Sequence, residues 1–363
     1  MRKPEQTKPV VALSKKLYNP QLDMLKGFAI LLVVLGHATQ TYASNGNFDN
    51  NLLFRIIYSF HMPLFMFLSG AVAAYSSRPM NFDFIKRKFY QLVVPFIAWY
   101  LLGYYLFSTY HHIHFSTYIH RVIVSPDYGL WFLWVLFLNF CALALIKYLS
   151  SWLKLWSYLI VWLAIYMIPT GKYGIGLVKW HLPFFIIGYL IFAYREHLVR
   201  YRKFAFTLSI VAFPVLVSSW HRLYDPSFVT GLGPRLAHHH LSDLTVGDLA
   251  TVHTYPIADL FYKYLVAFSG IGFVYYLLLL KPNRYIYSIL SFLGLYTLDI
   301  YVSHQLLLQY RFGTSWMAIG TSFIFATALS LALGYLLLRR VTLLSIIFLG
   351  GRTKPASLSL KKK

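Results

Sequence analysis

Three ionisable residues, Asp23, Lys26 and His37, lie within the first apolar run of the chain, residues 22–42. Such side chains are costly inside a membrane-length segment and usually serve function there. Lys26 and His37 are eleven residues apart, so in a helix they share one face at roughly 16 Å from each other. Asp23 and Lys26 can pair, which makes the lysine tolerable near the membrane edge. Because histidine can take a proton from a hydroxyl near neutral pH, this run predicts a helix with a cation at one end and a general base toward the other.

Two further histidines are expected at a similar depth. His61 lies in the second apolar run, in FHMPLFMFLSG, and His304 lies in a late run, in LDIYVSHQ, with Asp299 five residues before it. Helix rise places the two histidines roughly 13 Å and 9 Å below the outer ends of their runs. A single histidine in a membrane helix usually serves packing or hydrogen bonding, whereas three at one level favour a shared site with His37.

Candidate substrate-binding residues lie near the outer ends of two runs. Arg55 can extend its guanidinium outward to water, or it can point inward at a substrate oxygen. Trp131, with Trp134 nearby, can stack on a sugar ring or can anchor its helix at the membrane interface. The sequence leaves both alternatives open.

A run of cations, Lys86, Arg87 and Lys88, precedes the third apolar run. It can reflect the excess of positive charge on the cytoplasmic side of membrane proteins. Alternatively it can hold a phosphorylated ligand that arrives from the cytoplasm, because Lys and Arg recognise phosphate by charge and geometry.

Several other kinds of site are not indicated. The histidines at 238–240 are adjacent, a spacing that fits no specific metal-ligand set, so we expect no metal. The chain contains no nucleophile elbow, no phosphate-binding loop of the Walker type and no dinucleotide fingerprint. Its single cysteine, Cys141, excludes an intramolecular disulfide.

The composition indicates what kind of structural element carries these residues. The chain has 363 residues, of which 58% are hydrophobic and 12% are charged, which is typical of a multi-pass membrane protein. The net charge of +22 is spread between apolar runs and forms no single stripe, so a nucleic-acid partner is not expected. We therefore predict an all-α transmembrane helical bundle of about ten spans. The predicted spans are 22–43, 52–75, 91–110, 129–149, 153–169, 181–194, 203–220, 256–280, 288–310 and 315–338.

The distribution of Lys and Arg predicts the orientation. If the N-terminus is cytoplasmic, 24 of the 33 Lys and Arg residues fall in cytoplasmic segments, so both termini are expected there. The chain then divides into a basic cytoplasmic tail (1–20), a transmembrane domain (21–340) and an interfacial segment with a second basic tail (341–363). A long extracytoplasmic loop is expected at 221–255.

Five motifs in this order resemble the acyltransferase-3 family of integral membrane acyltransferases. They are LDMLKG followed by His37, then FHMPLFMFLSG, KRK before LVVPF, LWFLWVLF and GLYTLDIYVSH. The resemblance covers essentially the whole chain. The FHMPLF version is most similar to members that O-acetylate polysaccharides such as O-antigen or exopolysaccharide.

The resemblance implies roles for the candidate residues. His37 resembles the catalytic histidine, and Lys26 occupies a position where the family has arginine; lysine keeps the charge but lacks the planar fork. Lys86, Arg87 and Lys88 resemble the segment linked to the acyl-CoA donor. Beside the resemblance, the depth of the remaining residues suggests their roles. We expect Lys26 to stabilise charge near the donor, Asp299 and His304 to assist His37 in catalysis, and His61, Arg55 and Trp131 to contact the acceptor sugar.

The expected activity is O-acetyl transfer. Acetyl-CoA approaches from the cytoplasm, and a hydroxyl of a glycan or lipid-linked saccharide approaches from the other side of a bacterial inner membrane. Polysaccharide assembly proteins are possible partners. Two other classes stay open on the sequence: a proton-coupled exporter of a glycan or small solute, and a non-catalytic scaffold in a polysaccharide assembly complex.

Overall fold

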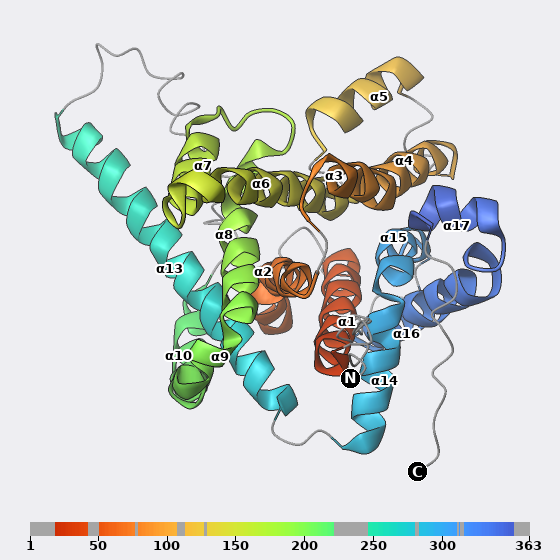
Figure 1. Cartoon of the computed structure of the whole chain (residues 1–363). Helices are drawn as coiled ribbons and strands as arrows, with labels where there is room; N and C mark the ends of the chain where they lie inside the picture. The colour runs from red at the N-terminus through yellow and green to blue at the C-terminus, as the bar shows by residue number, and fades with distance from the viewer. Residues whose placement is uncertain are drawn as a thin grey trace, which may run out of the picture.

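The computed structural model describes residues 19–42, 51–76, 79–106, 113–126, 129–220, 246–279, 283–310, 312 and 316–351, with the backbone alone at 42, 246–258, 279 and 316. Regular structure in this part of the chain is entirely helical (Figure 1), which confirms the all-α prediction. The elements are α1 (Pro20–Tyr42), α2 (Leu52–Ala74), α3 (Phe82–Lys88), η3 (Phe89–Val93), α4 (Val94–Leu106), α5 (Phe115–Val124), α6 (Trp131–Leu153), α7 (Trp156–Met167), α8 (Ile175–Ala193), α9 (Arg195–Leu198), η5 (Val199–Tyr201), α10 (Arg202–Ser218), α13 (Val246–Leu279), α14 (Arg284–Leu295), α15 (Thr297–Leu307), α16 (Trp316–Leu333), η8 (Gly334–Leu338) and α17 (Thr342–Leu349).

The described part has eight helices that are long and apolar enough to cross a membrane. The pair α14 and α15, which is bent by 79°, brings the number to nine if it forms one broken span. The count of about ten was too high because the fifth predicted span is α7, which has 12 residues, whereas a crossing needs about 20.

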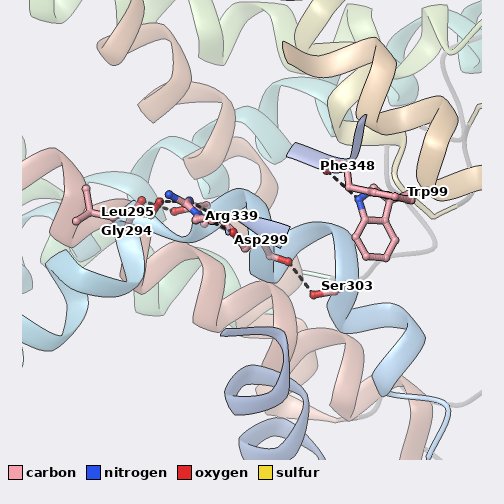
Figure 2. A network of polar contacts seen from close by, with 8 residues as sticks. Trp99, Gly294, Leu295, Asp299, Ser303, Arg339 and Phe348 are labelled. Carbon is pink, nitrogen blue, oxygen red and sulfur yellow. Dashed lines mark hydrogen bonds and ion pairs between the residues drawn. The ribbon is translucent and has the colours of Figure 1, made fainter. Parts of the chain in front are cut away.

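Two helices begin earlier than the sequence predicts, and the predicted interfacial segment contains a helix. The helical stretch predicted at 91–110 begins at Phe82, so the cations at 86–88 lie on helix α3, which the Asn81 side chain caps at the backbone N–H of Phe84. Helix α13 begins at Val246, within the expected loop 221–255; residues 221–245 lie outside the described residues. The segment after 341 contains helix α17, which receives a hydrogen bond of 3.0 Å from the Trp99 indole of α4 at the carbonyl of Phe348 (Figure 2).

Helix α1 is central and packs against α2, α14, α15 and α16 (Figure 1). Its apolar side chains are buried around much of its circumference, including Met24, Leu25, Ile30 and Val34, which are fully inaccessible. Among its ionisable residues Asp23 is buried, and Lys26 and His37 are half-buried. These three side chains therefore lie at least partly among neighbouring helices.

The crossing of α1 and α14 depends on two glycines. A Cβ on Gly27 would lie 1.8 Å from the carbonyl oxygen of Leu290, and a Cβ on Gly294 would lie 1.9 Å from that of Asp23. The backbones can approach this closely only because neither position carries a side chain. This contact fixes the start of α1, with Asp23 and Lys26, against the end of α14.

Helices α14 and α15 meet at an abrupt bend. Tyr296 ends one helix and begins the other, and the Thr297 hydroxyl donates a 2.7 Å hydrogen bond to the carbonyl of Gly294. Because of the bend, α15, which carries Asp299 and His304, runs in a different direction from α14 and packs against α1.

We expect Gly27→Ala to lower the free energy of unfolding by about 1–3 kcal/mol, because the added methyl forces the two backbones apart. The measurement is thermal unfolding of the purified protein in detergent. Gly320→Ala in α16 is the control: its Cβ would meet nothing within 4 Å, so its stability should be unchanged or slightly higher. Equal melting temperatures for Gly27→Ala and wild type would contradict the role given to this crossing.

Candidate active site

His37 of α1 and His304 of α15 lie side by side. Their ring centroids are 5.3 Å apart, with the rings tilted by 41°, and His304 is completely buried. Residues that are 267 positions apart in the sequence thus form a histidine pair inside the bundle.

The hydrogen bonds of His304 define which ring nitrogen carries the proton. Its Nδ1 lies 2.7 Å from the carbonyl oxygen of Tyr301 and 3.1 Å from that of Ile300. Carbonyl oxygens only accept, so Nδ1 must donate, and in the neutral ring Nε2 is then a lone-pair acceptor. This buried Nε2 has no hydrogen-bond partner among the described residues. It is therefore available to accept a proton or a hydrogen bond.

His61 joins this pair through Tyr58. The ring of Tyr58 lies 6.3 Å from that of His37, edge to face, and 4.7 Å from that of His61. The Nδ1 of His61 lies 2.8 Å from the carbonyl of Ile57, so His61 also presents Nε2 as an acceptor. The three histidines expected at one depth are therefore gathered in one cluster, and Tyr58, which we did not predict, lies between two of them.

Asp299 is held by Arg339 in a buried ion pair (Figure 2). The guanidinium donates from Nε to Oδ1 at 2.7 Å and from Nη2 to Oδ2 at 2.6 Å, and Nη2 also reaches the carbonyl of Leu295 at 2.9 Å. The main-chain carbonyl of Asp299 accepts a 2.7 Å bond from the Ser303 hydroxyl. The carboxylate thus fixes the bend between α14 and α15.

Sequence analysis gives Arg339 no role, because it counts this residue among the Lys and Arg residues of the cytoplasmic side. It directly follows the last long apolar run, where a positive charge usually reports topology. The available signal was the aspartate in the preceding run, since a buried carboxylate requires a partner. Gly334 makes room for the pair: a Cβ there would lie 2.6 Å from Asp299 Oδ1.

A cavity of about 160 Å³ lies at the lysine end of α1. Lys26 lines it and forms a 2.5 Å ion pair with Asp23, as expected from their spacing. Lys88 lines it from α3, with its ammonium 4.0 Å from the centre of the Phe140 ring. The remaining lining is mostly apolar: Met62, Phe65, Ser69, Val72, Gln91, Leu92, Phe132, Leu133, Leu136, Phe140, Gly294, Thr297, Leu298 and Tyr301.

Lys86 and Arg87 are not part of this lining. Lys86 is exposed and Arg87 is half-buried on the same short helix as Lys88. The structure therefore divides the predicted basic run into one lysine that lines the cavity and two cations that do not.

Arg55 lies against the end of α10. Its Nε donates to the carbonyl of Trp220 at 2.7 Å, and its Nη2 donates to the carbonyls of Ser218 and, at 3.4 Å, Val217. These carbonyls lack helical donors because the helix ends there, so the guanidinium caps α10. The ring centroid of Trp131 lies 4.9 Å from that of His181, so Arg55 and Trp131, two of the three predicted acceptor-binding residues, both have protein partners.

Tyr301 connects the cavity to the histidines. It lines the cavity, and its ring centroid lies 5.9 Å from that of His304 on the same helix. Sequence analysis gave it no role, since a tyrosine in an apolar run is common. The described residues contain no group of three His, Cys, Asp or Glu side chains placed to hold a metal ion, and residues 238–240 lie outside them.

The sequence is similar to a known protein family and to two curated proteins. A family model described as "Acyltransferase domain" (Acyl_transf_3) matches residues 19–339. The chain is 32% identical over 183 residues to Nodulation protein NolL of Sinorhizobium fredii (strain NBRC 101917 / NGR234), covering 46% of this chain and 47% of that protein. It is 27% identical over 216 residues to Nodulation protein NolL of Mesorhizobium japonicum (strain LMG 29417 / CECT 9101 / MAFF 303099), covering 53% and 54%. The chain spans about half the length of these curated relatives, and no solved structure matches it.

We expect Arg339→Ala to lower the free energy of unfolding by about 3–5 kcal/mol, because it leaves the buried carboxylate of Asp299 without a partner. Chemical denaturation in detergent measures the loss. The double variant Asp299→Asn with Arg339→Gln removes both charges and should recover most of it.

Arg195→Ala is the matched control for this ion pair. Arg195 and Glu196 form an exposed pair at 3.9 Å, which should contribute less than about 1 kcal/mol. A double variant at 299 and 339 no more stable than Arg339→Ala would contradict the proposed charge pairing.

Proposed function

The chain belongs to the acyltransferase-3 family, and on this premise we propose that it transfers an acetyl group from acetyl-CoA to a hydroxyl of an exported or cell-surface glycan. The family match over residues 19–339 confirms the resemblance seen in the sequence, and the chain is a multi-pass membrane protein. The observation that carries the proposal is the His37–His304 pair, which Tyr301 connects to a cavity that Lys26 and Lys88 line.

The lysines of the cavity are assigned to the acyl donor. Lys26 and Lys88 both line the space, and ammonium groups bind phosphate oxygens by charge-assisted hydrogen bonds. Lys86 and Arg87, outside the lining, attract the anionic donor toward the cavity mouth. The apolar walls then accept the uncharged arm and the acetyl group.

The histidine pair is assigned to proton transfer. His37 removes the proton of the acceptor hydroxyl as that oxygen attacks the acetyl carbon. The resulting imidazolium lies beside His304, whose Nε2 lone pair can accept a hydrogen bond from it. Asp299 supports this step indirectly, because its ion pair with Arg339 holds the helix that carries His304.

The acceptor hydroxyl is assigned to the side of the His37–His304 pair that is opposite to the lysines. The helix rise along α1 separates Lys26 from His37 by roughly 16 Å, so the two substrates reach the site from opposite ends. His61 is close enough to orient the acceptor hydroxyl through Tyr58. Arg55 and Trp131 shape the outer part of the path through their contacts with α10 and His181. The bacterial cytoplasmic membrane, with both chain termini on the inner side, fits this arrangement.

We expect His37→Ala and His304→Ala to lower acetyl transfer by at least about 100-fold, since general base catalysis contributes about that much or more. The assay supplies labelled acetyl-CoA to membranes and measures alkali-labile label on the glycan fraction. His197→Ala, at an exposed histidine of α9, should leave transfer unchanged. Undiminished labelling with well-expressed His37→Ala would refute the central assignment, and glycan export without labelling by the wild type would favour a transporter.

We expect Lys88→Ala to raise the KM for acetyl-CoA about 10-fold or more, because a hydrogen bond to a charged phosphate contributes about 1.5–3 kcal/mol. Lys147→Ala is the matched control. Lys147 is also a partly buried lysine over an aromatic ring, 4.7 Å from Tyr189, but it does not line the cavity. Equal KM values for the two variants would contradict the assignment of Lys88 to the donor.

A further inference from the structure

Tyr301 lies where the two halves of the site meet. It lines the cavity that contains Lys26 and Lys88, and it is one helical turn from His304, with 5.9 Å between their ring centroids. Its side chain is 6% exposed. Tyr301 is therefore a residue that both lines the cavity and neighbours the histidine pair.

The Tyr301 hydroxyl is fixed by the start of another helix. It accepts a hydrogen bond of 3.3 Å from the backbone N–H of Phe132, in the first turn of α6. The first N–H groups of a helix lack helical acceptors and carry partial positive charge. This bond orients the hydroxyl oxygen and favours negative charge near it.

The proton of the same hydroxyl is available to a ligand. The described residues offer it no hydrogen-bond acceptor, since the bond from Phe132 uses only the oxygen lone pair. Tyr301 is buried beside aromatic rings: the ring centroid of Phe132 lies 5.4 Å from that of Tyr301, and that of Phe65 lies 5.5 Å from that of Phe132. In such an apolar setting a hydrogen bond to a developing charge is much stronger than in water.

We propose that Tyr301 is a catalytic residue whose hydroxyl donates a hydrogen bond to the carbonyl oxygen of the acyl thioester. This inference rests on the proposed function. When the acceptor oxygen forms its bond to the carbonyl carbon, charge develops on the carbonyl oxygen, and Tyr301 stabilises it while keeping its own proton. The proton of the acceptor hydroxyl goes to His37. The bond from carbon to sulfur then breaks, and the thiolate of CoA takes that proton from His37.

The first test is Tyr301→Phe, which removes the hydroxyl and keeps the ring. Loss of one such donor typically lowers turnover by about 100- to 1000-fold, so kcat should fall by that much while the KM for acetyl-CoA stays the same. Tyr264→Phe is the matched control, because it also removes one hydroxyl bond, of 3.3 Å to the carbonyl of Trp180, away from the cavity lining. Equal kcat values for wild type and Tyr301→Phe would overturn the inference and leave the proposed function intact.

A spectroscopic test separates hydrogen bonding from structural support. The probe is a ketone analogue of acetyl-CoA, with a methylene group between sulfur and a ¹³C-labelled carbonyl, which binds but cannot transfer its acyl group. Its infrared carbonyl band should lie at lower frequency in the wild-type protein than in Tyr301→Phe, and Tyr264→Phe should match the wild type. Identical bands in all three would overturn the inference. Failure of the analogue to bind the wild type would overturn the proposed donor, and the inference with it.

Discussion

The ion pair between Asp299 and Arg339 is the interaction on which the site depends most. Both groups are almost completely buried, so each would be strongly unfavourable without the other. Together they join the start of α15 to the turn after η8, and Arg339 also holds the carbonyl of Leu295 at the end of α14 (Figure 2). The bend of 79° between α14 and α15 is therefore held by side chains that satisfy one another.

The direction of α15 decides what the site contains. The bent helix carries Tyr301 to the cavity and His304 to His37, whereas a straight continuation of α14 would take both along a different line. The close crossing at Gly27 and Gly294 sets the other boundary, because it locks α1 against α14 just before the bend. The backbone contact at Gly27 and Gly294 thus positions α1 against α14, and the ion pair of Asp299 with Arg339 positions α15.

Much of this arrangement could be predicted from the sequence. Apolar runs predict helices reliably because a membrane requires them, and costly ionisable residues stand out against such runs, which is why the sequence singles out His37, His61, His304 and Asp299 as candidates. Arg339 and Tyr301 give no such signal, because the residues that they contact at the candidate site are far away in the chain. An arginine after an apolar run has the same local sequence pattern whether it faces water or a carboxylate. A bend between two helices produces no periodic pattern of apolar residues from which it could be predicted. The 12-residue helix α7 likewise shows that apolar character alone does not define a span.

The rigidity of α1 restricts the kind of acyl donor that fits. Lys26 and His37 belong to one continuous helix, so their separation of roughly 16 Å cannot close during the reaction. Under the proposed function, a donor whose phosphates bind at the lysines must present its acyl carbon to His37 across a distance of that order. We therefore expect an acyl phosphate, whose acyl carbon is one oxygen away from phosphorus, not to reach both ends at once. A donor whose acyl group is joined to its phosphates by a long uncharged arm can do so, and the apolar lining between Lys88 and Tyr301 is suited to hold such an arm.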